Sequence, residues 1–152
     1  HFVMGFVLEI QNRKARGVRY FKYNGGANAS WISRNMIISG ATVLAFLFVH
    51  MYDFWFHEMV YKYVEFSPED PTRYYAETVE KFHSPIKTVL YVVFFVLLAL
   101  HLLHGFASSF QTMGVNNKYS AAIKTFTKVY AIAIPFGFAF IAIYHHLNPI
   151  TQ

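Results

Sequence analysis

Four long apolar stretches, separated by polar and charged segments, divide the chain. They run from His1 to Ile10, from Met36 to Phe56, from Ile86 to Phe110 and from Ala121 to Leu147. A helix needs about 20 apolar residues to cross a hydrocarbon core of about 30 Å. The last three stretches meet this length, and the first supplies about half of it. The pattern predicts an all-α transmembrane helical bundle with three complete spans and the C-terminal half of a further span.

We expect a single transmembrane domain over residues 1–152, with helices over 1–12, 31–57, 85–113 and 121–147. Residues 58–84 are expected to connect two spans and to contain a short surface helix from Thr72 to Phe82. The apolar residues start at His1 without an initiator Met or a basic region, unlike a signal peptide. We therefore interpret the chain as a fragment.

The charged residues favour one orientation in the membrane. Arg13–Arg34 contains six Lys and Arg and no acid, and Gly114–Lys128 contains three Lys and no acid. Cytoplasmic loops are typically enriched in Lys and Arg, so we place both segments in the cytoplasm. Residues 53–87 hold seven of the eight acids and are expected outside, together with the C-terminus.

The composition agrees with lipid as the solvent. Only 14% of the residues are charged, against roughly 25% in an ordinary soluble domain. The net charge of +5 does not indicate nucleic acid, because the basic residues lie in short segments between apolar runs. The chain has no cysteine, which excludes thioether-attached haem, cysteine-ligated clusters, disulfides and thiolate catalysis within it.

Histidine remains as the metal ligand, and the eight histidines differ in depth. Four lie at span ends, where an interfacial polar residue is the expected role: His57, His83, His145 and His146. An ionisable group deep in hydrocarbon is a functional-site hypothesis by default. The deep set is His1, His50, His101 and His104.

Two deep histidines lie at the same level. At about 1.5 Å per residue, His1 is about 18 Å from Arg13, and His101 is about 20 Å from Gly114. A low-spin haem b iron needs two axial imidazoles at one depth on facing helices. His1 and His101 meet this condition and are predicted to ligate one haem.

A glycine follows each of these two histidines by four residues, at Gly5 and Gly105. Residues four apart share a helix face, and a glycine there lets a flat macrocycle approach the backbone. We expect both glycines to pack against haem. A single buried histidine could instead form an interhelical hydrogen bond.

The other two deep histidines, His50 and His104, do not form a ligand pair of their own. His50 is about 12 Å from the acidic side and belongs to an outer level, where its partner must come from an absent helix. His104 is one turn from His101 and could replace it as ligand or bond a haem propionate. Arg34 and Ser39 are further candidates for propionates or quinone, although Arg34 could also be a cytoplasmic-side anchor.

The chain resembles the five-helix, two-haem cytochrome b subunit of the succinate:quinone oxidoreductase family, in the single-anchor form of succinate dehydrogenases and fumarate reductases. The resemblance covers essentially the whole chain. The segments that carry it are His1-Phe-Val-Met-Gly5, Asn12-Arg-Lys-Ala-Arg16, Ser33-Arg-Asn-Met-Ile-Ile-Ser-Gly40, Val49-His-Met-Tyr-Asp-Phe-Trp55 and His101-Leu-Leu-His-Gly-Phe-Ala-Ser-Ser-Phe110.

The resemblance implies that helices one to four each supply one axial histidine and that the first helix is missing here. It pairs His1 with His101 around the haem nearer the cytoplasm and leaves His50 with a missing partner. It further implies two haem b groups, a quinone, in this form menaquinone, and a flavoprotein and an iron–sulfur subunit on the cytoplasmic side. The complex would lie in the bacterial cytoplasmic membrane and could dimerise as a whole.

Three alternatives were weighed. A cytochrome b of the quinol–cytochrome c type would carry two ligands about fourteen residues apart on each of two helices, and no such pairs occur here. The haem subunit of a formate dehydrogenase or hydrogenase is a closer rival. A transporter or structural anchor without a redox centre would use the deep histidines as interhelical hydrogen-bonding groups.

Overall fold

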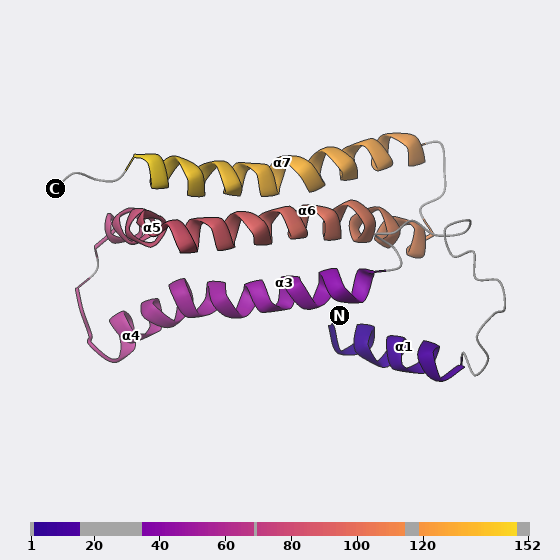
Figure 1. Ribbon diagram of the computed structural model, residues 1–152, viewed down its shortest axis with the longest axis horizontal. Coiled ribbons are helices and arrows are strands. Elements are labelled where there is room, and N and C mark those ends of the chain that lie inside the picture. Colours follow the sequence, from indigo (N-terminus) through magenta and orange to yellow (C-terminus); the bar gives the residue numbers. More distant parts are fainter. Residues whose placement is uncertain (1, 16–34, 69, 115–118, 149–152) are drawn as a thin grey trace.

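Three long helical rods lie side by side in the computed structural model, which describes residues 2–15, 35–68, 70–114 and 119–148. Helix α6 (Pro85–Thr112) lies in the middle and runs antiparallel to α3 (Met36–His50) and to α7 (Ser120–Leu147) (Figure 1). A shorter helix, α1 (Phe2–Ala15), lies beside the start of α3. No strand occurs in these described ranges, which confirms the predicted all-α fold.

The first rod is longer than α3 alone. A π-helical turn (Met51–Phe56) follows α3 directly and leads into α4 (His57–Tyr63), so one helical rod runs from Met36 to Tyr63. The helix therefore continues past residue 57, where the sequence led us to expect its end. π-Helical turns inside α-helices are rare. Those that occur often lie at functional sites.

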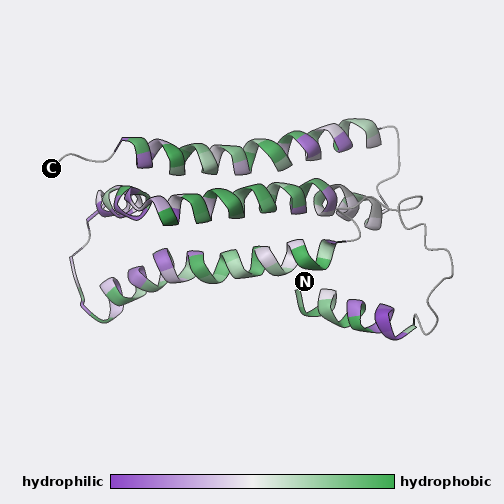
Figure 2. Cartoon of the chain, viewed as in Figure 1, coloured by the Kyte–Doolittle hydropathy of each residue, from purple (hydrophilic) through white to green (hydrophobic). Residues whose placement is uncertain are grey.

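The three rods are each long and apolar enough to cross a membrane: Met36–Tyr63, Pro85–Phe110 and Ser120–Leu147. Figure 2 shows hydrophobic residues along the middle of α6 and α7, with hydrophilic ones gathered towards the helix ends. Many large apolar side chains on the rods are exposed, among them Phe48 on α3 and Phe136 on α7. A bilayer is the solvent that can cover such surfaces, so we treat the chain as a membrane protein.

Small and compact side chains bring α7 against α6. Thr127, Ala131, Pro135 and Ala142 are all buried on α7, and both alanines are fully inaccessible. In membranes, small residues at an interface let two helices approach closely and gain van der Waals contact. The helix continues through Pro135 without a break.

The described core lies towards the end of the bundle that carries α5 (Arg73–His83), which we call the α5 end. Phe46 of α3 packs edge-on against two α6 rings, with centroids 5.8 Å from Tyr91 and 5.6 Å from Phe95. Phe82 of α5 and Ala142 of α7 complete this cluster. Four helices thus meet around one set of aromatic rings, where edge-to-face contacts are favourable.

Helix α5 is held at both ends. At its start, the Asp70 carboxylate accepts hydrogen bonds from the Thr72 amide at 2.9 Å and from the Thr72 hydroxyl at 2.6 Å. At its end, the Phe82 carbonyl lies 2.8 Å from the Thr88 hydroxyl of α6 and 3.0 Å from Nδ1 of His146 of α7. These contacts fix the surface helix expected from Thr72 to Phe82 against both neighbouring rods.

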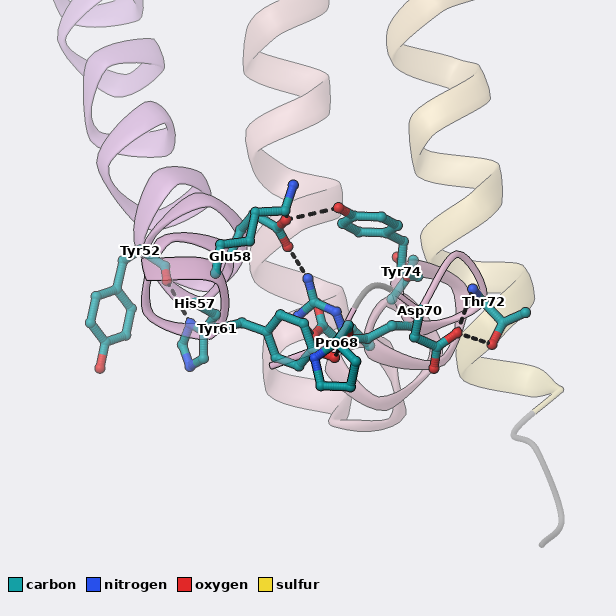
Figure 3. A network of polar contacts seen from close by, with 12 residues as sticks. Tyr52, His57, Glu58, Tyr61, Pro68, Asp70, Thr72 and Tyr74 are labelled. Atoms are coloured by element: carbon teal, nitrogen blue, oxygen red, sulfur yellow. Dashed lines mark hydrogen bonds and ion pairs between the residues drawn. The ribbon is translucent and has the colours of Figure 1, made fainter. Parts of the chain in front are cut away.

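A polar network joins α4 to α5 (Figure 3). Glu58 accepts hydrogen bonds from the guanidinium of Arg73 and from the hydroxyl of Tyr74. The guanidinium also lies over the Tyr61 ring, 3.7 Å from its centroid. Because Arg73 and Glu58 are mostly buried, their pairing fastens the connection between the first and second rods.

Candidate functional site

A cavity of about 440 Å³ lies between α1 and α3 and reaches His101 of α6. We call this the α1 end of the bundle, opposite the α5 end (Figure 1). Apart from one imidazole and two polar side chains of α1, its lining is apolar or glycine. The lining residues used below are Gly5, Met36, Gly40, Ala41 and His101.

His101 is held by α3 in this cavity. Its Nδ1 lies 3.1 Å from the hydroxyl oxygen of Ser39, and the same hydroxyl lies 2.9 Å from the carbonyl oxygen of Met36. A Cβ built on Gly40 would lie 3.6 Å from Cε1 of the imidazole, which is ordinary contact distance. The imidazole therefore lies against the backbone of α3 with one ring nitrogen bonded to it through Ser39.

The two glycines predicted to pack against haem lie in different surroundings. Gly5 lines the cavity, and a Cβ built there would meet nothing within 4 Å. Gly105 faces α3, where a Cβ would lie 2.9 Å from the terminal methyl of Met36. Gly5 thus borders open space, whereas Gly105 accommodates a side chain of α3. Packing of a macrocycle at both glycines stays a prediction.

Two of the predicted site residues, His1 and Arg34, lie outside the described residues. His104, the alternative ligand, is half-buried one turn after His101. Its backbone carbonyl accepts a hydrogen bond from Ser108 at 2.7 Å. The structure therefore describes one member of the predicted ligand pair, His101, and shows its contact with Ser39. A role of Ser39 towards a propionate or quinone stays a prediction.

His50 lies at the other level, at the junction of α3 and the π-helical turn. Its ring centroid is 5.5 Å from that of Phe46, 5.0 Å from that of Phe54 and 6.4 Å from that of Tyr91. The residue as a whole is exposed. An exposed imidazole that contacts aromatic rings has room for a further ligand.

Sequence reasoning missed a buried charged cluster beside His50. Asp53, in the π-helical turn, is only 3% exposed and pairs with the ammonium group of Lys87. Its second carboxylate oxygen accepts a hydrogen bond from the Tyr91 hydroxyl at 3.1 Å. An acid within an apolar run was the available signal, but the sequence pattern only placed Asp53 near the outer end of the helix expected over 31–57 and gave it no partner.

Two of the four histidines expected at span ends hydrogen-bond backbone carbonyls: His146 near the end of α7, and His57 at the start of α4, inside the first rod. His57 Nδ1 lies 3.0 Å from the carbonyl oxygen of Tyr52, and His146 bonds Phe82 as described above. His145 packs edge-on against Tyr75 of α5, with centroids 5.5 Å apart. The His145 and His146 contacts connect α7 to α5, whereas the His57 bond stays within the first rod. Nδ1 of His145 is buried without a hydrogen-bond partner among the described residues.

The donor set of the described residues suits haem better than a bare metal ion. No group of three or more His, Cys, Asp or Glu side chains converges there to hold an ion. A haem iron needs only two axial ligands from the protein, because the macrocycle supplies the other four. The cavity is mostly apolar, with the polar side chains of Glu9 and Asn12 on α1, and its one imidazole, His101, could serve as one of two such ligands.

Comparison with protein-family models, with curated proteins and with solved structures finds no match to this chain.

Proposed function

We propose that this chain is the membrane anchor and electron-transfer subunit of a succinate:quinone oxidoreductase, either a succinate dehydrogenase or a fumarate reductase. It would pass electrons between a quinone and the iron–sulfur subunit through two haem b groups. The observation that carries the proposal is the cavity at the α1 end, into which α6 places His101 with Nδ1 bonded to Ser39. The sequence resemblance supplies the family.

The cavity supports haem through its shape, lining and donor. Its volume of about 440 Å³ lies within the range of roughly 300–1,000 Å³ typical of cofactor sites. Gly5 and Gly40 keep side chains away from it on two helices, and Ala41 adds only a methyl group. His101 offers the imidazole, and His1 would offer the second ligand.

The outer level would use His50 with a histidine from a further helix. Phe46, Phe54 and Tyr91 surround one side of its ring and would fix its orientation. Haem supplies a one-electron carrier when bound, which no side chain of this chain provides. The role of the chain is to hold two such groups at different depths, so that electrons can cross the bilayer.

The partners follow from the same proposal. A flavoprotein and an iron–sulfur subunit would dock at the α1 end, near the basic segments Arg13–Arg34 and Gly114–Lys128, where succinate and fumarate are interconverted. Menaquinone would exchange electrons within the anchor. The α5 end would face outward from a bacterial cytoplasmic membrane, in agreement with the positive-inside rule.

A reduced-minus-oxidised visible spectrum of membranes that contain the full-length subunit tests the proposal. We expect b-type haem bands, two haems per chain by pyridine haemochrome assay, and co-purification of a flavoprotein with succinate dehydrogenase activity. Absence of any reducible haem would establish a non-redox anchor and contradict the proposal. Co-purification of formate dehydrogenase or hydrogenase subunits instead would contradict the family assignment while preserving haem binding.

A further inference from the structure

Three polar groups form a short chain between α3 and α6. The carbonyl oxygen of Met36 lies 2.9 Å from the hydroxyl oxygen of Ser39, which in turn lies 3.1 Å from Nδ1 of His101. The chain crosses from one turn of α3 to the imidazole that lines the cavity. Both Ser39 and His101 are partly buried, so these bonds are sheltered by the two helices.

The direction of the two hydrogen bonds can be assigned from the groups themselves. A carbonyl oxygen only accepts, and a hydroxyl has a single proton to donate. The Ser39 proton is therefore directed to Met36, whose sulfur, at 3.9 Å, is a second and weaker acceptor for the same proton. Both contacts are then hydrogen bonds in the tautomer in which Nδ1 of His101 carries the ring proton and Ser39 accepts it.

This assignment fixes the tautomer of the imidazole. In a neutral imidazole, one ring nitrogen carries the proton and the other presents a lone pair. With the proton on Nδ1, the lone pair lies on Nε2, the nitrogen through which a histidine can bind a metal while Nδ1–H holds its orientation. The geometry around Ser39 thus prepares His101 as a ligand.

We infer that Ser39 is a positioning residue, which fixes the Nδ1–H tautomer and the ring orientation of His101 so that Nε2 ligates the haem iron. This inference rests on the proposed function. Acceptors on Nδ1–H make an axial imidazole more basic, which favours ferric over ferrous iron. Ser39 therefore acts on the potential of the haem at the α1 end, and it selects His101 rather than His104 as the ligand.

The test compares Ser39→Ala, Ser39→Thr and Thr42→Val in the full-length subunit with its partner subunits. Ser39→Ala removes the acceptor, whereas Ser39→Thr keeps a hydroxyl. Thr42→Val is the matched control, because the Thr42 hydroxyl donates to the Ile38 carbonyl one turn further along α3. Haem affinity, midpoint potential and the ferric electron paramagnetic resonance spectrum are measured for each variant.

Ser39→Ala should weaken binding of one haem on the order of 10–100-fold, the usual cost of losing a group that orients a metal ligand. The haem that remains bound at this level should have a higher midpoint potential and altered ferric g-values. Ser39→Thr should restore all three properties, and Thr42→Val should match the wild type.

Two results would overturn the inference. Wild-type affinity, potential and g-values in Ser39→Ala would show that the hydroxyl does not act on His101. Equal losses in Ser39→Ala, Ser39→Thr and Thr42→Val would show that only packing of α3 was disturbed. A wild-type subunit that binds no haem would instead remove the proposed function itself, so the two failures are distinguishable.

Discussion

The two ends of the bundle are built differently. At the α5 end, Phe46, Tyr91 and Phe95 fill the space between the rods. Asp53 and Lys87 form an ion pair there. At the α1 end, α1 and α3 leave a cavity of about 440 Å³ beside His101. Protein interiors are usually close-packed, so space of this size is typical of a ligand site rather than of a stabilising core.

The comparison indicates which residues stabilise the fold and which residues would serve a bound group. The aromatic cluster and the Asp53–Lys87 pair at the α5 end are held by contacts within the chain, and their loss should lower the free energy of unfolding. At the α1 end, Gly5 borders open space, and a change there should affect a bound group before it affects the fold.

The largest effect is expected from filling the cavity. Gly5→Phe adds a ring at the wall of the cavity, where the new Cβ meets nothing within 4 Å. We expect nearly complete loss of the haem at this level with little change in thermal unfolding. Haem content per chain and differential scanning fluorimetry in detergent measure the two.

Gly137→Phe is the matched control for Gly5→Phe. Gly137 on α7 also has open space around a Cβ, but it does not line the cavity. Its variant should retain wild-type haem content. Equal haem loss in both variants would show that the space beside Gly5 is not the site.

The next largest effect concerns the α5 end and should appear as a lower free energy of unfolding. Lys87→Met removes the cation that pairs with Asp53 and leaves a carboxylate that is 3% exposed without its counter-charge. Breaking a buried pair in this way costs about 3–5 kcal/mol, and the 37% exposure of the Lys87 side chain favours the lower end. Denaturation in mixed micelles measures the free energy of unfolding.

Lys62→Met provides the comparison for that variant. Lys62 pairs with Glu58 one helical turn away, but the lysine side chain is 45% exposed. Pairs of this kind contribute little to stability, because solvent screens the two charges. If Lys87→Met lowers the free energy of unfolding no more than Lys62→Met does, Asp53 is solvated. The ion pair with Lys87 would then not stabilise the α5 end.

The smallest effect is a dependence on pH at the start of α5. The hydroxyl and amide of Thr72 hold the pKa of Asp70 below its usual value of about 4. A group with a lowered folded-state pKa stabilises the fold above its unfolded pKa, and this contribution disappears as pH falls through the folded value. The protection of amides at the first turn of α5, relative to their intrinsic exchange rates, should therefore decrease only below about pH 4.

Asp70→Asn keeps an acceptor oxygen but does not titrate, so the protection of amides at the start of α5 in this variant should not change across this range. A wild-type profile that follows the variant's would mean that Thr72 does not act on the Asp70 carboxylate.

The all-α fold could be predicted because each span is a long apolar run. The expected limits 85–113 and 121–147 lie close to α6 and α7 in the structure, since Pro85 and the polar residues near 120 mark the boundaries. The first rod was less predictable. Its helix continues to Tyr63 because Asp53, Glu58 and Lys62 have partners that allow charged residues to remain helical.

The candidate site was predictable at the level of single residues but not of contacts. Periodicity and depth identify His101 as a deep histidine. They cannot show that Ser39 reaches its Nδ1, because that bond depends on how α3 and α6 cross. Asp53 and Lys87 are 34 positions apart, and only the folded chain brings them together.

The account depends most on His101 as a haem ligand, and haem content of His101→Ala beside His104→Ala tests this directly. We predict that His101→Ala loses the haem at the α1 end and keeps the other, while His104→Ala keeps both, as counted by redox titration of the visible spectrum. Retention of both haems in His101→Ala, or loss of one in His104→Ala, would contradict the account.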